Sequence, residues 1–162
     1  MLNECIFCNL YKRKEEIIFE NECFYAIFDR FPINPGHALI VSKKQIVSLL
    51  DLGKFEWEYL KPAIERTKEI IESTNLSELY IKFLKNPISE RINERSRGFL
   101  EAMIARRGQN KKPDGYNIGV NEGEAAGRTI HHLHFHIIPR YYGDLENPRG
   151  GIRNIIPGMG DY

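Results

Sequence analysis

Cysteine, long apolar runs and net charge are all scarce in this sequence. Only three of its 162 residues are cysteine, too few for the disulfide framework of a small secreted domain, so we expect a reducing cytoplasm. No stretch approaches the ~20 consecutive apolar residues of a membrane-spanning helix, and the first residues lack the apolar segment of a secretion signal. The formal net charge of +1 gives no reason to expect nucleic acid as a partner.

The apolar residues follow two periodicities. Strands are predicted where apolar residues alternate or are β-branched and aromatic: residues 17–29 as two strands, then 37–41, 116–121 and 132–137. Residues 49–75 have helical spacing, and Pro62 predicts that the regular helix begins near Lys61. Residues 89–107 predict a second helix, which Gly98 weakens. The chain is long enough for one domain with its own core, of the α+β class with an antiparallel sheet.

Positive charge gathers in one segment. Residues 82–112 contain nine Lys or Arg and three Glu, so this segment alone carries +6. A run of charge is most often a solvated face. The alternative is a lid or electrostatic funnel for a polyanionic substrate, in which Arg106 and Arg107 are candidates.

Histidine is concentrated in one short stretch. Four of the five histidines lie between residues 131 and 136, and three of them alternate with apolar residues. On a β-strand this alternation places His132, His134 and His136 on one face. Three imidazoles on one face suit either a metal ion or phosphoryl chemistry, in which one ring is the nucleophile and the others donate hydrogen bonds.

The loop before these histidines favours phosphoryl chemistry. Residues 119–129 read Gly-Val-Asn-Glu-Gly-Glu-Ala-Ala-Gly-Arg-Thr. Backbone N–H groups of such a glycine-rich loop can turn inward together and bind an anion. A phosphate held beside three histidines points to phosphoryl transfer rather than to hydrolysis by a metal.

These residues resemble the signature of the histidine triad (HIT) superfamily. The resemblance rests on Gly-Arg-Thr-Ile-His-His-Leu-His-Phe-His-Ile-Ile at residues 127–138, on Pro-Gly-His-Ala-Leu-Ile-Val at 35–41, and on a tail similar to that of prokaryotic dinucleoside polyphosphate hydrolase-like members. It implies a HIT-like fold with helices packed mainly on one face of the sheet. It also implies a homodimer. We expect one domain over residues 1–162, with a basic helical insertion at about 76–112 that the resemblance does not cover.

The catalytic group implied by this resemblance has four histidines. His134 is the natural nucleophile because it has a histidine two residues away on each side, and the family suggests that the main-chain carbonyl of His132 fixes its tautomer. The resemblance adds His37 beside His136 as partners around the phosphate. The chemistry would need no cofactor.

The nucleotide-binding residues combine the resemblance with side-chain chemistry. Asp29 matches the family's ribose-binding acid. Phe19 and Phe28 offer an apolar slot for an adenine or guanine base. Contacts to phosphate are expected from the loop, at Asn121, Gly127, Arg128 and Thr129. Arg128 departs from the pattern, because the family usually has glutamine there. A permanent cation at this position could stabilise the phosphorane more strongly, or it could hold the product and slow turnover.

Cys5 and Cys8 have the spacing of a metal site or of a redox pair. Relatives with such a pair are often zinc proteins, which implies His132 as a third ligand. The fourth position, usually histidine, is Gln45 here, a poor ligand for zinc. Cys23 or His131 could replace it only if the fold brought either close. We expect less than one equivalent of structural zinc, the alternative being two small buried cysteines that pin the N-terminus.

The resemblance thus predicts a nucleotide hydrolase. It would cleave the α-phosphate linkage of a dinucleoside polyphosphate or a nucleoside phosphoramidate through a nucleotidyl-histidine. Two alternatives stay open: a nucleotidyltransferase or phosphorylase, and a nucleotide-binding protein with little turnover.

Overall fold

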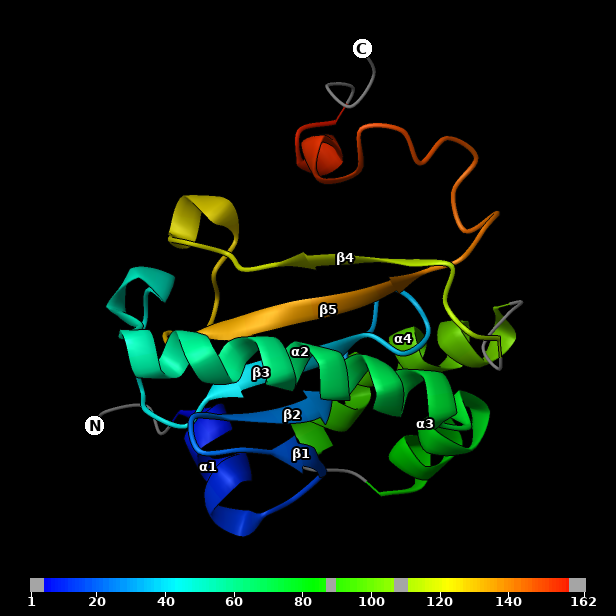
Figure 1. Cartoon of the computed structure of the whole chain (residues 1–162). Helices are drawn as coiled ribbons and strands as arrows, with labels where there is room; N and C mark the ends of the chain where they lie inside the picture. The colour runs from blue at the N-terminus through cyan, green and yellow to red at the C-terminus, as the bar shows by residue number, and fades with distance from the viewer. Residues whose placement is uncertain (1–4, 87–89, 107–110, 158–162) are drawn as a thin grey trace.

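The fold is organised around one antiparallel sheet (Figure 1). A computed structural model describes residues 5–86, 90–106 and 111–157. Five strands lie in the order β1-β2-β3-β5-β4, and every neighbouring pair is antiparallel. They are β1 (Ile17–Glu20), β2 (Phe24–Phe28), β3 (Ala38–Ser42), β4 (Gly115–Gly119) and β5 (His134–Arg140). β5, which carries two of the alternating histidines, is a central strand and is therefore held from both sides.

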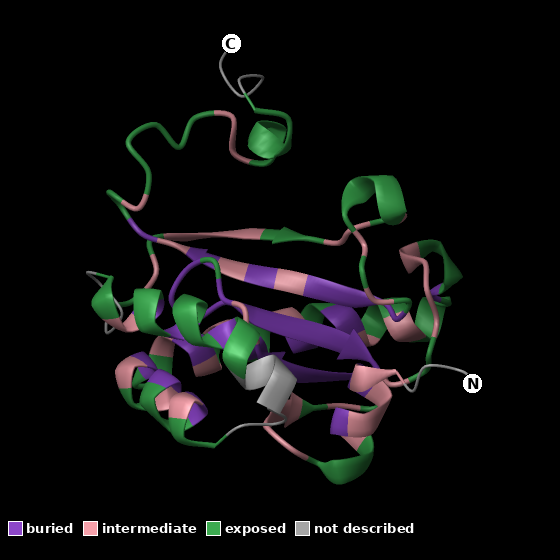
Figure 2. Cartoon of the chain, turned by 180° about the vertical axis from the view of Figure 1, so that it is seen from behind, coloured by how far each residue is buried: buried purple, intermediate pink, exposed green. Residues whose placement is uncertain are grey.

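Helices cover the two faces of the sheet unequally. The helices are α1 (Ile6–Arg13), α2 (Lys54–Ser73), α3 (Leu76–Lys85) and α4 (Glu90–Ala105). The larger core joins one face of the strands to buried residues of α2, α3 and α4. The smaller core joins Tyr25, Ile27, Leu39 and Val41 of the other face to two residues of α1. Figure 2 shows the buried residues concentrated on β2, β3 and β5. The predicted α+β class and the HIT-like arrangement are confirmed.

The longest helix begins earlier than the sequence predicted. α2 runs from Lys54, with Pro62 inside it, so the predicted start near Lys61 is wrong. Proline removes one backbone donor from a helix. Here Pro62 is exposed, and so is Glu58, whose carbonyl loses that donor. Water can therefore satisfy the carbonyl, which explains how the helix continues through the proline.

The pair of helices α3 and α4 holds the connection between β2 and β3. Arg30 donates hydrogen bonds to the carbonyls of Phe83 (2.9 Å) and Asn86 (3.2 Å), at the end of α3. Arg106, just after α4, donates to the carbonyl of Ile33 at 3.0 Å and to Asn34 Oδ1 at 2.7 Å. These contacts fix the position of the segment that ends in His37.

The carboxyl-terminal tail extends beyond the β4 edge of the sheet (Figure 1). It includes a short 3-10 helix, Gly151–Ile155, whose first residue lies beside Asn117 of β4. Ile152, Ile155 and Ile156 of this tail are exposed. No helix in the described ranges combines the length and apolar character that crossing a membrane requires.

Candidate active site

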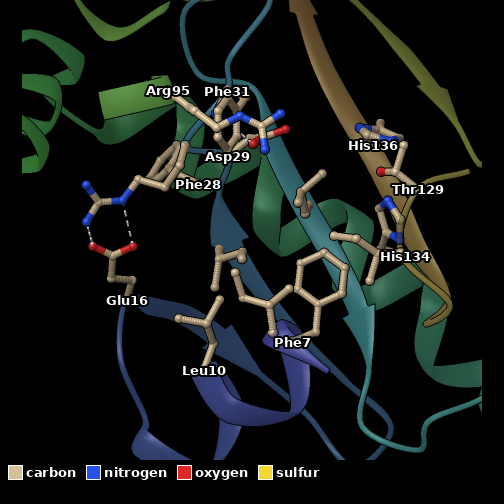
Figure 3. Close-up of a pocket in the computed structure, with 15 residues that line it drawn as sticks. Phe7, Leu10, Glu16, Phe28, Asp29, Phe31, Arg95, Thr129, His134 and His136 are labelled. Carbon is tan, nitrogen blue, oxygen red and sulfur yellow. Dashed lines mark hydrogen bonds and ion pairs between the residues drawn. The ribbon is translucent and has the colours of Figure 1, made fainter. Parts of the chain in front are cut away.

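One cavity of about 520 Å³ lies beside the histidine strand (Figure 3). Its walls come from α1 and Glu16 after it, the end of β2 with the residues that follow it, Leu39 of β3, α4, the loop that precedes β5, and β5 itself. Of the expected site residues, five line it: Phe28, Asp29, Thr129, His134 and His136. The cavity is therefore where residues distant in sequence meet, and its chemistry can be examined group by group.

One ring nitrogen of His134 is hydrogen-bonded to the protein, and the other has no hydrogen-bond partner among the described residues. Its Nδ1 lies 2.8 Å from the carbonyl oxygen of His132. A carbonyl only accepts, so Nδ1 must carry the proton and Nε2 must carry the lone pair. The ring is buried against Phe7, with ring centroids 5.0 Å apart. A neutral imidazole with a fixed tautomer and a free Nε2 lone pair is a good nucleophile.

His136 and His37 form a chain with Asp29. His136 Nδ1 and His37 Nε2 are 3.0 Å apart, and His37 Nδ1 is 3.4 Å from Asp29 Oδ2. Burial, with neighbouring histidines adding to it, lowers the pKa of His37 to about 4 and that of His136 to about 4. Both rings are therefore neutral at pH 7. The backbone N–H of Ile33 donates to His37 Nδ1 at 3.5 Å, so in the neutral rings His37 Nε2 donates to His136 Nδ1 and His136 carries its proton on Nε2. This Nε2 is buried and has no hydrogen-bond partner among the described residues, so a ligand oxygen could accept its proton.

Asp29 combines a structural bond with a free position in the cavity. Its Oδ1 accepts a hydrogen bond from the backbone N–H of Phe31 at 2.8 Å. Burial raises the pKa of its carboxyl, although this backbone bond opposes the shift. The carboxylate faces the cavity (Figure 3) and can accept the hydroxyl groups of a sugar there.

The apolar wall of the cavity comes mainly from α1, which the sequence analysis missed. Ile6, Phe7 and Leu10 of this helix line the cavity together with Ile27 and Leu39 of the sheet, against which Phe7 and Leu10 pack. Their helical spacing is a signal that identifies them, although Cys5 and Cys8 in the same segment match the spacing of a metal site. These residues form a flat apolar slot of the kind that a nucleobase needs.

Phe19 lies elsewhere than expected. It packs against the larger core, on the face of the sheet that α2 covers, because it is the register partner of Ala26. Neighbouring residues of a strand point to opposite faces. Phe19 therefore does not line the cavity. Phe28 shares the face of Ala26 and belongs to the same core, but it lines the cavity because it lies at the end of β2.

The glycine-rich loop contributes to the cavity only through its last residues. Gly123 and Gly127 have φ angles of +95° and +90°, which the loop's turns require. Asn121 Nδ2 donates to the carbonyl of Gly127 at 3.5 Å, so these two expected phosphate ligands contact each other. Thr129, in contrast, lines the cavity.

Arg128 points away from the cavity. Its guanidinium donates to the carbonyl of Val47 at 3.1 Å and lies 3.6 Å from Glu122. A cation bound in this way is not positioned to contact phosphate at His134. Arg128 is accordingly not among the residues that line the cavity.

A separate group of possible metal ligands lies around His132. Cys5 Sγ is 3.3 Å and Cys8 Sγ 3.6 Å from His132 Nδ1, and the three ligand atoms lie within 4.8 Å of one another. His132 Nε2 is 2.6 Å from the carbonyl oxygen of Ser42, so Nε2 carries the proton and the Nδ1 lone pair faces the sulfurs. Two thiols and one imidazole fit zinc.

Gln45 occupies the fourth side of this group. Its Oε1 is 3.5 Å from Cys8 Sγ. Neither of the alternative ligands joins the group: Cys23 packs against the larger core, and His131 is exposed and lies 3.4 Å from Glu124. The donor set in this chain is therefore two sulfurs, one nitrogen and one weak amide oxygen.

Arg95 of α4 also lines the cavity and was not expected there. Of the two arginines proposed for a funnel, Arg106 is bound to Ile33 and Asn34, while Arg107 lies outside the described residues. Nothing in the sequence distinguishes Arg95 from the other cations of its segment, because its position depends on how α4 packs.

Comparisons with known proteins agree with this geometry. The family model described as HIT domain matches residues 12–143, and the chain belongs to this family. It is 29% identical over 154 residues to the uncharacterized HIT-like protein MJ0866 of Methanocaldococcus jannaschii, covering 93% of this chain and 91% of that protein. It is 27% identical to the bis(5'-adenosyl)-triphosphatase of Dictyostelium discoideum over 83% of this chain and 66% of that protein.

A solved structure shares the fold. It is described as a Zn-bound histidine triad family protein from Mycobacterium smegmatis, and it matches with a TM-score of 0.58 and 24% identity over 87% of this chain and 78% of that one.

Proposed function

We propose that this protein is a nucleotide hydrolase that cleaves the α-phosphate linkage of a dinucleoside polyphosphate or a nucleoside phosphoramidate. The observation that carries the proposal is the fixed tautomer of His134, whose Nδ1 proton is held by the carbonyl of His132 at 2.8 Å. This leaves the Nε2 lone pair for attack on phosphorus from a ring that lines the cavity.

The reaction would proceed in two steps. First, His134 Nε2 forms a bond to the α-phosphorus while the bond to the leaving group breaks. Water then attacks the same phosphorus, the N–P bond breaks, and the nucleoside monophosphate is released. His136 Nε2, buried and unpartnered within the described structure, is available to a phosphate oxygen. Thr129 could offer its hydroxyl to the leaving oxygen.

The walls of the cavity suggest how a nucleotide would lie. The base would enter the apolar slot formed by Phe7, Leu10 and Ile27, and the sugar hydroxyls would bond to Asp29. The α-phosphate would then reach His134 and His136. The likeness to a relative named as a bis(5'-adenosyl)-triphosphatase supports this class of substrate.

We also propose that Cys5, Cys8 and His132 hold a structural zinc, with Gln45 as a weak fourth contact. The spacing of the thiols and imidazole supports this assignment. The metal would tie α1 to the residues before β5, since His132 and the two cysteines come from opposite ends of the chain. No step of the reaction uses it.

We propose further that two copies of the chain associate through β4. Like β1, this strand lies at an edge of the sheet, and an edge strand can pair with another chain. Sedimentation of wild-type protein as a monomer at micromolar concentration would contradict this arrangement.

Substitution of His134 tests the hydrolase. His134→Asn should lower kcat by about a thousandfold or more while nucleotide binding is retained, because the slot and Asp29 are unchanged. His131→Asn is the matched control, since His131 is exposed and contacts Glu124, and it should keep wild-type turnover. Product analysis with and without inorganic phosphate would distinguish hydrolysis from phosphorolysis. Near-normal turnover of His134→Asn would contradict the proposal.

A further inference from the structure

Two of the four charged groups of the cavity neutralise each other. Four charged residues line it: Glu16, Asp29, Arg30 and Arg95. Glu16 and Arg30 form an ion pair through both oxygens of the carboxylate. Two further donors of Arg30 bind the carbonyls of Phe83 and Asn86. This arginine is buried and is therefore committed to holding the fold rather than to binding a ligand.

The other basic groups near the cavity carry no charge or face elsewhere. Burial keeps the rings of His37 and His136 neutral at pH 7, since the pKa of each is about 4. Arg128 is directed toward Val47 and Glu122. A polyphosphate entering this cavity would therefore meet the carboxylate of Asp29 and, among the lining residues that the structure describes, a single cation outside an ion pair.

That cation is Arg95. It is exposed on α4, and its guanidinium carbon lies 6.0 Å from the centre of the Phe31 ring. Figure 3 draws its side chain reaching from the helix toward the cavity, on the side of Phe31. The helix beneath it is held in place, because Phe99 packs edge-on against Phe31 with centroids 5.7 Å apart. The guanidinium is thus delivered to the cavity by an anchored helix.

We propose that Arg95 binds the phosphate groups beyond the α-phosphate and so makes this site selective for dinucleoside polyphosphates over nucleoside phosphoramidates. The inference rests on the proposed function and decides between its two substrate classes. The leaving group of a nucleoside phosphoramidate is an amine, which offers a guanidinium no phosphate to bind. The leaving group of a dinucleoside polyphosphate is a nucleotide anion, and guanidinium binds phosphate through two parallel hydrogen bonds.

The experiment compares two substrates across three variants: Arg95→Gln, Arg95→Lys and Arg97→Gln. Arg97 is the matched control, because it is exposed on the same helix and lies 3.6 Å from Glu101. The substrates are diadenosine tetraphosphate and adenosine 5'-phosphoramidate. Arg95→Gln should lower kcat/KM for the tetraphosphate by about tenfold to a hundredfold, as for loss of a hydrogen bond to a charged group, and leave the phosphoramidate nearly unchanged.

The other two variants and the salt dependence show how much of the effect comes from the positive charge of Arg95 and how much from the geometry of its guanidinium. Arg95→Lys should recover part of the loss, because lysine keeps the charge but cannot form the two-pronged contact. Raising the salt concentration should shrink the difference between wild type and Arg95→Gln. Arg97→Gln should match wild type on both substrates. An equal loss on both substrates in Arg95→Gln, or no loss on the tetraphosphate, would overturn the role of Arg95 while leaving the hydrolase intact.

A binding measurement covers the case in which wild type hydrolyses neither substrate, which would refute the proposed function. Calorimetry with a methylene-bridged diadenosine tetraphosphate and with adenosine monophosphate gives the ratio of the two Kd values. Arg95→Gln should weaken binding of the tetraphosphate analogue about tenfold or more and leave the monophosphate unaffected. An unchanged ratio would refute the assignment of Arg95 independently of turnover.

Discussion

His132 and His136 lie symmetrically about His134 in the sequence, yet their surroundings have little in common. His132 faces the thiols of Cys5 and Cys8, whereas His136 contacts His37, which in turn lies near Asp29. Their alternation predicts only that they share one side of a strand, and in the structure His132 precedes β5, which begins at His134. What each ring can do depends on the segment brought against it, α1 in one case and residues 29–37 in the other.

The carbonyl group of His132 connects the cysteine side to the proposed nucleophile. His132 donates from Nε2 to the carbonyl of Ser42 at 2.6 Å, and its own carbonyl accepts the Nδ1 proton of His134 at 2.8 Å. The position of His132 therefore helps to orient the proposed nucleophile without contact between its ring and a substrate. We expect the cysteine side to govern metal binding and the His136 side to govern turnover.

The largest expected effect is a loss of turnover on the His136 side without a change in zinc content. His136→Asn should lower kcat by about a hundredfold, in the range for loss of a donor aimed at a transition-state anion, because Nε2 would no longer be available to a phosphate oxygen. Zinc content, measured by atomic emission, should stay at the wild-type value. A fall in zinc content with this variant would mean that the two sides are not independent.

The converse substitution changes the cysteine side. Cys5→Ser with Cys8→Ser should abolish zinc binding and lower the Tm by several degrees, since a structural metal contributes directly to folding. Turnover of the folded protein should fall by only about tenfold or less, as for a group that acts through another residue. Cys23→Ser is the control, because Cys23 lies in the larger core. Wild-type zinc content in the double variant would disprove the site.

Substitution of Gln45 should raise the zinc content, in contrast to the loss expected from the cysteine variant. Its oxygen is 3.5 Å from Cys8 Sγ, and amide oxygen is a poor ligand for zinc. Wild-type protein purified without added metal should therefore contain less than one equivalent, whereas Gln45→His should approach a full equivalent. A full equivalent already present in wild type would show that the three stronger ligands suffice.

A further expected effect is on stability as a function of pH. The pKa of His37 and of His136 is about 4 in the folded protein, well below the ordinary value. Between pH 6.5 and pH 4 the unfolded chain binds protons that these folded rings do not, so the free energy of unfolding falls as pH falls. Each ring contributes a slope of up to about 1.4 kcal/mol per pH unit.

His37→Asn should reduce this slope and His131→Asn should leave it unchanged. Urea titrations at several pH values between 4 and 7 measure the difference. The same slope in wild type and in His37→Asn would contradict the assignment of a buried, neutral ring to His37.

The strands of the sheet and the shared face of the histidines could be predicted from the sequence. Alternation is a local property, so it located the strands and placed His134 on a common face with its neighbours. A short motif likewise identified His37 and Asp29. The larger apolar wall was missed because α1 is only eight residues long and its apolar spacing overlaps the cysteines.

Long-range packing accounts for the remaining differences. Phe19 is apolar and adjacent to the right strands, but only its register with Ala26 reveals that it faces α2. Arg95 and Arg106 belong to the same basic segment, yet one lines the cavity and the other binds Ile33 and Asn34. Such distinctions depend on how α4 packs against distant residues, which local pattern does not encode.

Trapping the covalent intermediate tests the central claim most directly. Wild-type protein mixed with substrate labelled in the α-phosphate, and quenched without acid, should retain label as an acid-labile, base-stable adduct, as expected of a nucleotide bound to histidine through an N–P bond. Peptide mapping should find the adduct on His134 and should find none in His134→Asn. Label on another residue, or turnover in wild type without any adduct on His134, would contradict the account.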